Sequence, residues 1–362
     1  MTSLAASPAA RQSVSAVPQP CFWPPAPAIG CARDMGVIWP ATMRVRADLS
    51  DPTLPSATPD FLNHDRAPVP DIVVARGLVP FRLRDRPVRG RLVRLGPLAH
   101  ALLTRHENSA GVTALLGQAL ALTAGLAAAL KFRGSFSLQA KGDGPVTMLL
   151  ADCTDTGALR GYARADAERL DDLEGAGAML GKGYLAFTCD QGPDMDRYQG
   201  IVPIEGDTLA AMSDTYFRTS EQLRTHVHLA AAETPAGWRA AAFIMERVAA
   251  DGGIDAPEDA EEAWRTALAL AGTLSDAELL DDTLPPERLL HRLFHAEGLV
   301  VDQARALSYG CRCSRAKLAG VLEGFAAEDL DHMAEQGTIT MTCEFCNVGF
   351  KFERDEMRRA GP

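Results

Sequence analysis

Four cysteines near the carboxyl end have the spacing of a metal site. Cys311 and Cys313 form a C-x-C pair, Cys343 and Cys346 form a C-x-x-C pair, and 29 residues, 314 to 342, lie between the pairs. The C-x-x-C spacing lets two thiolates turn toward one ion, and two such pairs supply the four soft ligands that tetrahedral Zn(II) favours. We therefore predict one Zn(II) per chain, held by Cys311, Cys313, Cys343 and Cys346.

A metal held by four cysteines can be a static staple or part of a switch. The structural role is the commoner one, and it would make this chain a zinc-stabilised regulatory or protein-interaction module. A C-x-C pair is unusual in such a site, however, and its adjacent thiols could oxidise to each other as the metal leaves. Zinc-bound thiolates are deprotonated and stay open to oxidants. The residues alone leave both roles open.

The other four cysteines lie in unrelated contexts. Cys153 and Cys189 occur singly in stretches typical of strands or turns, and we predict that both are core or near-core residues, because free cysteine is often buried. Cys21 and Cys31 fall in a Pro-rich leader. A metal or disulfide pair there is less favoured than an untethered segment, or one that precedes a later start at Met35 or Met43.

Motifs that would indicate an enzyme are not matched. The stretch "GAGAMLGKG", residues 175–183, differs from a phosphate-binding loop at Ala176 and Gly183 and precedes a strand, whereas the motif needs a helix. His226 and His228 are predicted on one strand face, and His291 and His295 on a helix without the H-E-x-x-H signature. No nucleophile and base stand at a recognisable spacing, so we predict that the protein is not an enzyme.

Composition and charge exclude further classes. The chain of 362 residues is long enough for about two domains. A formal net charge of -11 argues against nucleic-acid binding, which requires a basic surface. The longest apolar run, residues 119–130, is too short to cross a bilayer and is predicted to be a buried helix. The first 30 residues lack a secretory signal, so we predict a cytoplasmic protein without a membrane partner.

The elements that must position the cysteines follow from hydrophobic periodicity. Residues 1–65 read as an irregular leader, and residues 66–249 as an α+β domain built on a mostly antiparallel sheet. Folding is predicted to begin near Ile72 with two strands, followed by a long helix from about Ser109 to Phe132 and a meander of strands joined by tight turns. A later helix, near residues 207–223, is predicted with Asp207 as its N-cap.

An acidic connector separates this domain from the cysteine module. Residues 250–299 are predicted to form two amphipathic helices, and from Asp251 to Glu287 eleven acidic residues face one basic residue, Arg265. Such one-sided charge predicts a loosely held segment. In residues 300–362 the sequence predicts two short helices and a strand–knuckle–strand arrangement. So small a core needs a metal to hold it together.

Several stretches together resemble the heat shock protein 33 family of redox-regulated molecular chaperones, over about residues 70 to 355. The similarity lies in "LKFRGSFSLQAKGDGP" (130–145), "LRGYAR" (159–164), "GKGYLAFT" (181–188), "RYQGIVPIEGDTLA" (197–210), "FRTSEQL" (217–223), "LLHRLFHAEGL" (289–299), "CRCSR" (311–315) and "CEFCNVGFKF" (343–352), in the family's order. The leader has no counterpart in the family, and Ala316 stands where the family commonly has glutamate.

The resemblance implies a function and a mechanism. The four cysteines would bind zinc in the reduced, inactive form, and oxidation would pair Cys311 with Cys313 and Cys343 with Cys346. Zinc would leave, the C-terminal module would unfold, and the connector would loosen. The apolar surface so exposed would hold unfolding client proteins without ATP, commonly as a homodimer.

Overall fold

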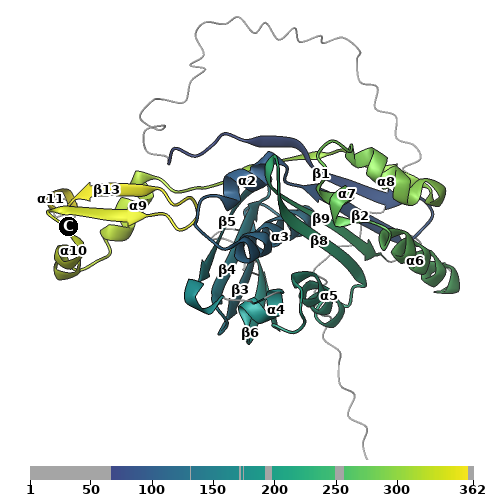
Figure 1. The fold of residues 1–362 in the computed structure, drawn as a ribbon, viewed down its shortest axis with the longest axis horizontal. Coiled ribbons are helices and arrows are strands. Elements are labelled where there is room, and N and C mark those ends of the chain that lie inside the picture. Colours follow the sequence, from purple (N-terminus) through teal and green to yellow (C-terminus); the bar gives the residue numbers. More distant parts are fainter. Residues whose placement is uncertain are drawn as a thin grey trace, which may run out of the picture.

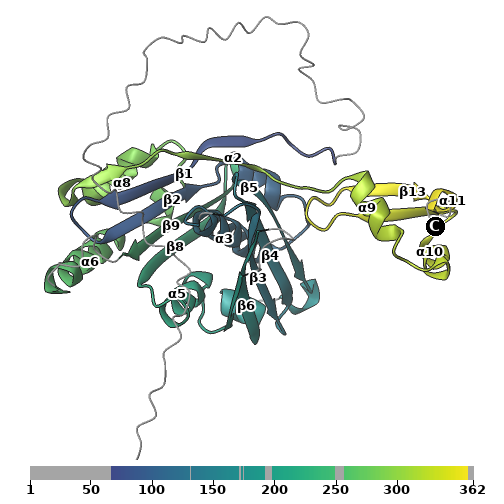
Figure 2. The ribbon, with the colours of Figure 1, turned by 180° about the vertical axis from the view of Figure 1, so that it is seen from behind.

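The computed structural model describes residues 67–130, 132–170, 173, 175–191, 198–248 and 257–357. They form a large body around a curved sheet, with a small C-terminal module projecting from one end (Figures 1 and 2). The predicted leader, with Cys21 and Cys31, lies outside the described residues.

The body is organised around one mixed sheet, in which the described strands run in the order β7-β6-β3-β4-β5-β11-β1-β2-β9-β8 and β10 also pairs with β1. Every pairing is antiparallel except that of β11 with β5. The mostly antiparallel α+β fold is thus confirmed. The bounds are β1 Val73–Leu83, β2 Val88–Arg94, β3 Ser135–Gly142, β4 Val146–Thr154, β5 Ala158–Ala165, β6 Gly183–Asp190, β7 Tyr198–Pro203, β8 Thr225–Thr234, β9 Gly237–Arg247, β10 Leu299–Val301 and β11 Arg305–Tyr309.

One long helix, α3 (Ala110–Ala127), fills the concave face of the sheet (Figure 1). It begins at the predicted position, where the Ser109 hydroxyl accepts a hydrogen bond from the backbone N–H of Val112. The helix carries its own leucine and alanine side chains on most sides, and they are buried because strands from both halves of the sheet pack on it. By length and composition α3 could cross a membrane, but 78% of it is buried inside the fold, as in the core helix of a globular body.

Alternate residues of the central strands pack into two different cores, one on each face of the sheet. In β9, Ala242 and Ile244 face α3, whereas Phe243 and Met245 face the opposite side of the sheet. A strand that is covered on both faces needs apolar residues at consecutive positions, and this accounts for the unbroken apolar run of β9.

The connector covers that opposite side with three helices, α6 (Pro257–Ala271), α7 (Asp276–Leu280) and α8 (Pro286–Phe294). Trp264, Leu289 and Phe294 are almost completely buried against the sheet. The Phe294 ring stacks on Phe81 and Phe243, with centroids 5.5 and 6.2 Å apart. The expectation of a loosely held connector is therefore wrong for this state, because an apolar core fastens the three helices.

Three short helices complete the body: α2 (Pro97–Leu103), α4 (Ala176–Leu180) and α5 (Leu209–Thr219). The glycine-rich stretch forms α4 and then enters β6, as expected of a segment that precedes a strand. The predicted N-cap of α5 was wrong by one residue. The hydroxyl of Thr208, and not the carboxylate of Asp207, accepts the hydrogen bond from Ala211 N–H.

The C-terminal module contains the elements that were predicted. Its helices are α9 (Arg315–Leu322), α10 (Ala327–Met333) and α11 (Arg354–Met357), and its hairpin consists of β12 (Thr338–Thr342) and β13 (Gly349–Glu353). Among the described residues of the module, its separate core has four buried side chains, which are Leu322, Leu330, Ile339 and Phe352. A core of this size agrees with a need for a further fastening.

Candidate metal centre

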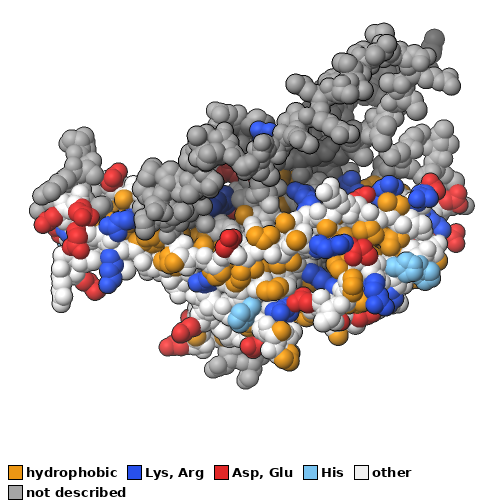
Figure 3. Space-filling model, turned by 90° about the horizontal axis from the view of Figure 1, so that it is seen from above, with side chains coloured by type: hydrophobic (Ala, Val, Ile, Leu, Met, Phe, Trp, Pro, Cys, Tyr) orange, Lys and Arg blue, Asp and Glu red, His pale blue; other side chains and the backbone are white. Residues whose placement is uncertain are grey.

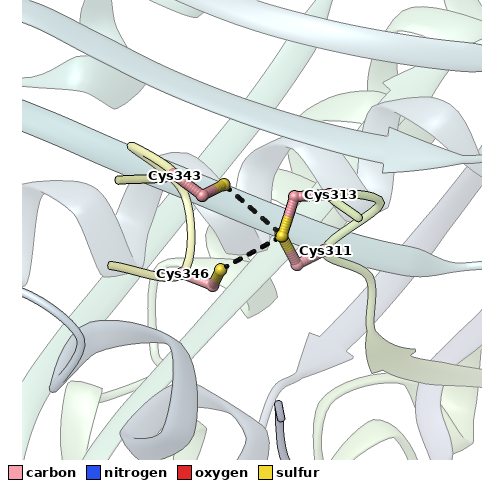
Figure 4. A group of neighbouring side chains, drawn as sticks. All are labelled: Cys311, Cys313, Cys343 and Cys346. Atoms are coloured by element: carbon pink, nitrogen blue, oxygen red, sulfur yellow. Dashed lines mark hydrogen bonds between the residues drawn. The ribbon is translucent and has the colours of Figure 1, made fainter. Parts of the chain in front are cut away.

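The fold brings the four cysteines of the tail together where the module meets the sheet body. The sulfur of Cys311 lies 3.3 Å from that of Cys313 and 3.7 Å from that of Cys343, and the sulfurs of Cys313 and Cys346 are 3.4 Å apart. All four lie within 4.8 Å of one another, and Figure 4 shows them converging from two chain segments. With Zn–S bonds of about 2.3 Å, a tetrahedral site would have sulfur–sulfur edges of about 3.8 Å. The group is therefore able to hold a metal ion.

Backbone hydrogen bonds shape both cysteine pairs. After β11, Gly310 N–H donates to Leu159 O at 2.7 Å, which anchors the start of the C-x-C segment to the sheet. In the second pair, Asn347 N–H donates to Cys343 O at 2.8 Å, and Cys343 N–H donates to Val348 O at 3.0 Å. Asn347 has a positive φ of 55°, a conformation that asparagine tolerates better than most residues. The turn points both thiols of the pair to the same side.

Burial and mutual hydrogen bonds shift the pKa values of the thiols in the cluster. Hydrogen bonds from the neighbouring thiols, first that of Cys311, lower the pKa of Cys343. Burial, as the largest cause, raises the pKa of Cys313 to about 12, and hydrogen bonding with Cys311 raises that of Cys346. Four thiolates at this spacing require a cation between them, and the all-sulfur donor set suits a soft divalent ion.

Residues that precede β1 cover part of the cysteine cluster, a contact that the sequence did not predict. Ala67 and Val69, which precede β1, pack against the cysteine cluster. Cys343 and Cys346 are consequently buried, whereas Cys311 and Cys313 keep some exposure. Solvent therefore reaches the C-x-C pair more easily than the C-x-x-C pair.

The residue between the C-x-C cysteines fastens the centre to the sheet. The guanidinium of Arg312 forms an ion pair with the carboxylate of Asp152 on β4. Asp152 is only 6% exposed and is also paired with Arg160 on β5, at 3.4 Å. Because the carboxylate is buried, loss of either arginine would leave charge poorly compensated.

The two residues inside the C-x-x-C pair, Glu344 and Phe345, also contact the sheet, on strand β5. The ring of Phe345 lies edge-on to Tyr162, with centroids 5.2 Å apart, and the Arg160 guanidinium sits 4.0 Å from the Phe345 ring centre. Glu344 forms an ion pair with Arg164. We call Arg312, Glu344 and Phe345 the clamp residues, since all three join the metal centre to β4 and β5. The sequence gives no sign of their role, because spacer residues carry no pattern of their own.

The other residues considered from the sequence do not join this site. Cys153 and Cys189 are buried in the core, as predicted, and burial raises the pKa of both, that of Cys153 to about 12. His226 and His228 lie on β8, and the rings of His291 and His295 stack on each other with centroids 5.3 Å apart. Among the described residues, the four tail cysteines are the group found with metal-binding geometry.

The fold and the site define a class of protein in which an α+β body carries a small module with a four-cysteine group able to hold a metal ion. The family model described as "Hsp33 protein" matches residues 77–353. The chain therefore belongs to the Hsp33 family, which is a family of chaperones and not of enzymes.

Individual relatives agree with this assignment. The chain is 40% identical over 284 residues to a 33 kDa chaperonin of Caulobacter vibrioides, covering 75% of this chain and 93% of the relative. It is 35% identical over 276 residues to that of Vibrio cholerae, covering 75% and 91%. The crystal structure of the 33 kDa chaperonin from Thermotoga maritima has the same fold, with a TM-score of 0.65 at 22% identity over 78% of this chain and 97% of the other.

Proposed function

We propose that this protein is a redox-regulated holdase, which binds unfolding proteins without ATP after oxidation and is inactive while reduced. The observation that carries the proposal is the placement of the four-cysteine cluster, whose spacer residues hold it against the sheet body. Chemistry at the sulfurs would therefore change a contact within the fold. The resting ion is proposed to be one Zn(II) per chain, and the protein to act in the cytoplasm.

The proposed switch is a four-electron oxidation of the cysteines. Bound Zn(II) would keep all four sulfurs as thiolates. Cys311 and Cys313, whose sulfurs are 3.3 Å apart, lose two electrons and form one disulfide, and Cys343 with Cys346 forms the second in the same way. Two equivalents of hydrogen peroxide take up the electrons and, with the available protons, become water. Disulfide sulfurs are poor ligands, so the ion leaves.

Loss of the ion would then spread to the rest of the chain. For a small metal-dependent module, the free energy of metal binding is largely its free energy of folding. The proposed module of residues 300–362 therefore unfolds, although β10 and β11, which lie at its start, belong to the large sheet. The clamp residues leave β4 and β5, the connector of residues 250–299 detaches from residues 66–249, and the exposed apolar face binds clients. Active chains are proposed to be homodimers.

The alternative of a static structural metal differs in its response to oxidant. We would titrate the reduced protein with peroxide and measure released zinc with a chromophoric chelator, free thiols, and disulfides by peptide mass mapping. The proposal expects about one zinc released per chain as four thiols disappear into the pairs Cys311–Cys313 and Cys343–Cys346. Zinc retained until the whole protein unfolds would instead favour a static staple.

The clamp gives a prediction about zinc retention in the reduced protein. Arg312→Met and Asp152→Asn should each speed the transfer of zinc to a chelator, by about tenfold for a loss of ~1.4 kcal/mol. The first leaves the buried carboxylate of Asp152 with Arg160 as its remaining cation, and the second removes the ion pair that holds Arg312 to β4. The double variant should be less impaired than the two single effects together, because neither charge remains. Strictly additive effects, or no effect, would show that the pair does not stabilise the centre.

A further inference from the structure

The acidic side chains of the connector meet basic side chains of the sheet body. Glu261 on α6 pairs with both Arg224 and Arg247, the latter at 2.9 Å. Asp276 on α7 lies 2.6 Å from His228 on β8. Further pairs of this kind are Asp282 with Arg239, Glu287 with Arg76, and Glu297 with Arg86 at 3.1 Å. The one-sided charge of the connector is thus answered by arginines that lie elsewhere in the sequence, together with a hydrogen bond to His228.

A buried arginine holds the connector backbone as well. Arg94, at the end of β2, donates hydrogen bonds to the carbonyl oxygens of Leu279 at 2.9 Å and Glu278 at 2.6 Å, and to that of Leu284. Its side chain is 7% exposed, and burial lowers its pKa. The backbone carbonyls at the end of α7 and in the loop after it thus accept their hydrogen bonds from the guanidinium group of a sheet residue.

Apolar residues occupy the area between these cations. The sheet contributes Phe81, Phe243 and Met245 to this core, and the connector contributes Trp264 and Phe294 among others. Figure 3, which views the molecule from above, shows basic, acidic and hydrophobic side chains interspersed at the end where α6 and α8 lie. The sheet side of this contact is an apolar strip bordered by Arg94, His228, Arg239 and Arg247, which we call the arginine-bordered face.

Departure of the connector would change the electrostatics of the arginine-bordered face. The side chains of Arg239 and Arg247 are 11% and 26% exposed while the connector is in place. Without the connector, the apolar strip would face water with cations whose carboxylate partners have left. A ligand that covers the strip must offer carboxylates or leave those cations desolvated and unpaired, which is costly.

We propose that the arginine-bordered face, once vacated, binds client segments with the chemistry of the connector itself, namely amphipathic helical segments with an apolar stripe and acidic flanks. The docked connector therefore competes with client segments for the arginine-bordered face. The inference rests on the proposed function for the step that removes the connector, and it adds a preference among clients. Basic amphipathic segments of equal hydrophobicity are disfavoured by the same cations.

The test uses two labelled peptides, one with the sequence of residues 257–294 and one in which each Asp and Glu is replaced by Asn or Gln. Binding is measured by fluorescence anisotropy to the oxidised full chain. It is also measured to a reduced full chain with Trp264→Asp and Leu289→Asp, two buried connector positions where a carboxylate prevents repacking. The acidic peptide should bind about tenfold more tightly at low salt, and the difference should shrink at about 500 mM sodium chloride.

Further variants tie the preference to the face. Arg239→Gln with Arg247→Gln should remove the preference for the acidic peptide, while Lys182→Gln, an exposed cation beside β6, should leave it unchanged. Equal affinity for the two peptides, or no binding to the variant with the displaced connector, would overturn the inference. If that variant prefers the acidic peptide but the oxidised chain binds neither, the inference holds and the proposed redox release of the connector fails.

Discussion

Serine in place of Cys343 is expected to abolish metal binding and unfold the C-terminal module. One of four ligand atoms is lost from a cluster whose sulfurs lie within 4.8 Å of one another, and serine does not supply a thiolate. Structural zinc contributes on the order of 10 kcal/mol to such a module, and a core of four buried residues does not offset the entropy of ordering the module without it. Zinc content should fall from about one per chain to near zero, and amide protons of β12 and β13 should exchange rapidly.

The matched control is serine at Cys189, which is also buried but lies in the core of the sheet body. This variant should lose some stability and keep its zinc, because its thiol takes no part in the cluster. Full metal content and a protected β12–β13 hairpin in the Cys343→Ser protein would contradict the assignment of the four cysteines as the ligand set.

Aspartate in place of Trp264 is expected to release the connector without oxidation. Trp264 is 2% exposed and lies in the apolar core between α6 and the sheet. An aspartate side chain there is too small to fill the space of the indole, and its negative charge would be buried without a partner. Loss of a buried tryptophan alone costs about 3–5 kcal/mol. If docking of the connector keeps the chaperone inactive, the reduced variant should suppress client aggregation while it still contains zinc.

Ala269→Asp provides the comparison, since position 269 is an exposed site on the same helix. That protein should remain inactive until it is oxidised. A Trp264→Asp variant that is folded, zinc-loaded and inactive, with α6 exposed to proteolysis, would show that displacement of the connector is insufficient for client binding.

The grouping of the four cysteines and the local elements were predictable because the information lies close together in the chain. The C-x-C and C-x-x-C spacings need no knowledge of the fold, and the hairpin around the second pair follows from strand-forming residues that flank a turn. In the sheet body, the meander of β3, β4 and β5 was predictable since tight turns force neighbouring strands to pair antiparallel.

Features that depend on distant parts of the chain were missed. Strand β11 inserts between β5 and β1, far from both in sequence, and pairs in parallel with β5 through only a few residues. The clamp partners Arg312 and Asp152 are 160 residues apart. Neither relationship leaves a periodic or spacing pattern that a single sequence can display.

The error about the connector has the same physical origin. Its acidic residues were assessed against their neighbours in sequence, among which Arg265 is the single base. Their partners are the side chains of Arg224, Arg239 and Arg247, which flank or lie in strands β8 and β9. Charge imbalance within a segment therefore did not predict how firmly that segment is held.

The most direct test of the central claim compares one preparation in three states: reduced with zinc, oxidised with peroxide, and reduced again with zinc restored. Light scattering of a heat-unfolding client is recorded with each. The redox-controlled holdase predicts suppression of aggregation in the oxidised state alone, lost again on re-reduction. Equal suppression in all three states, or none after confirmed formation of both disulfides, would contradict it.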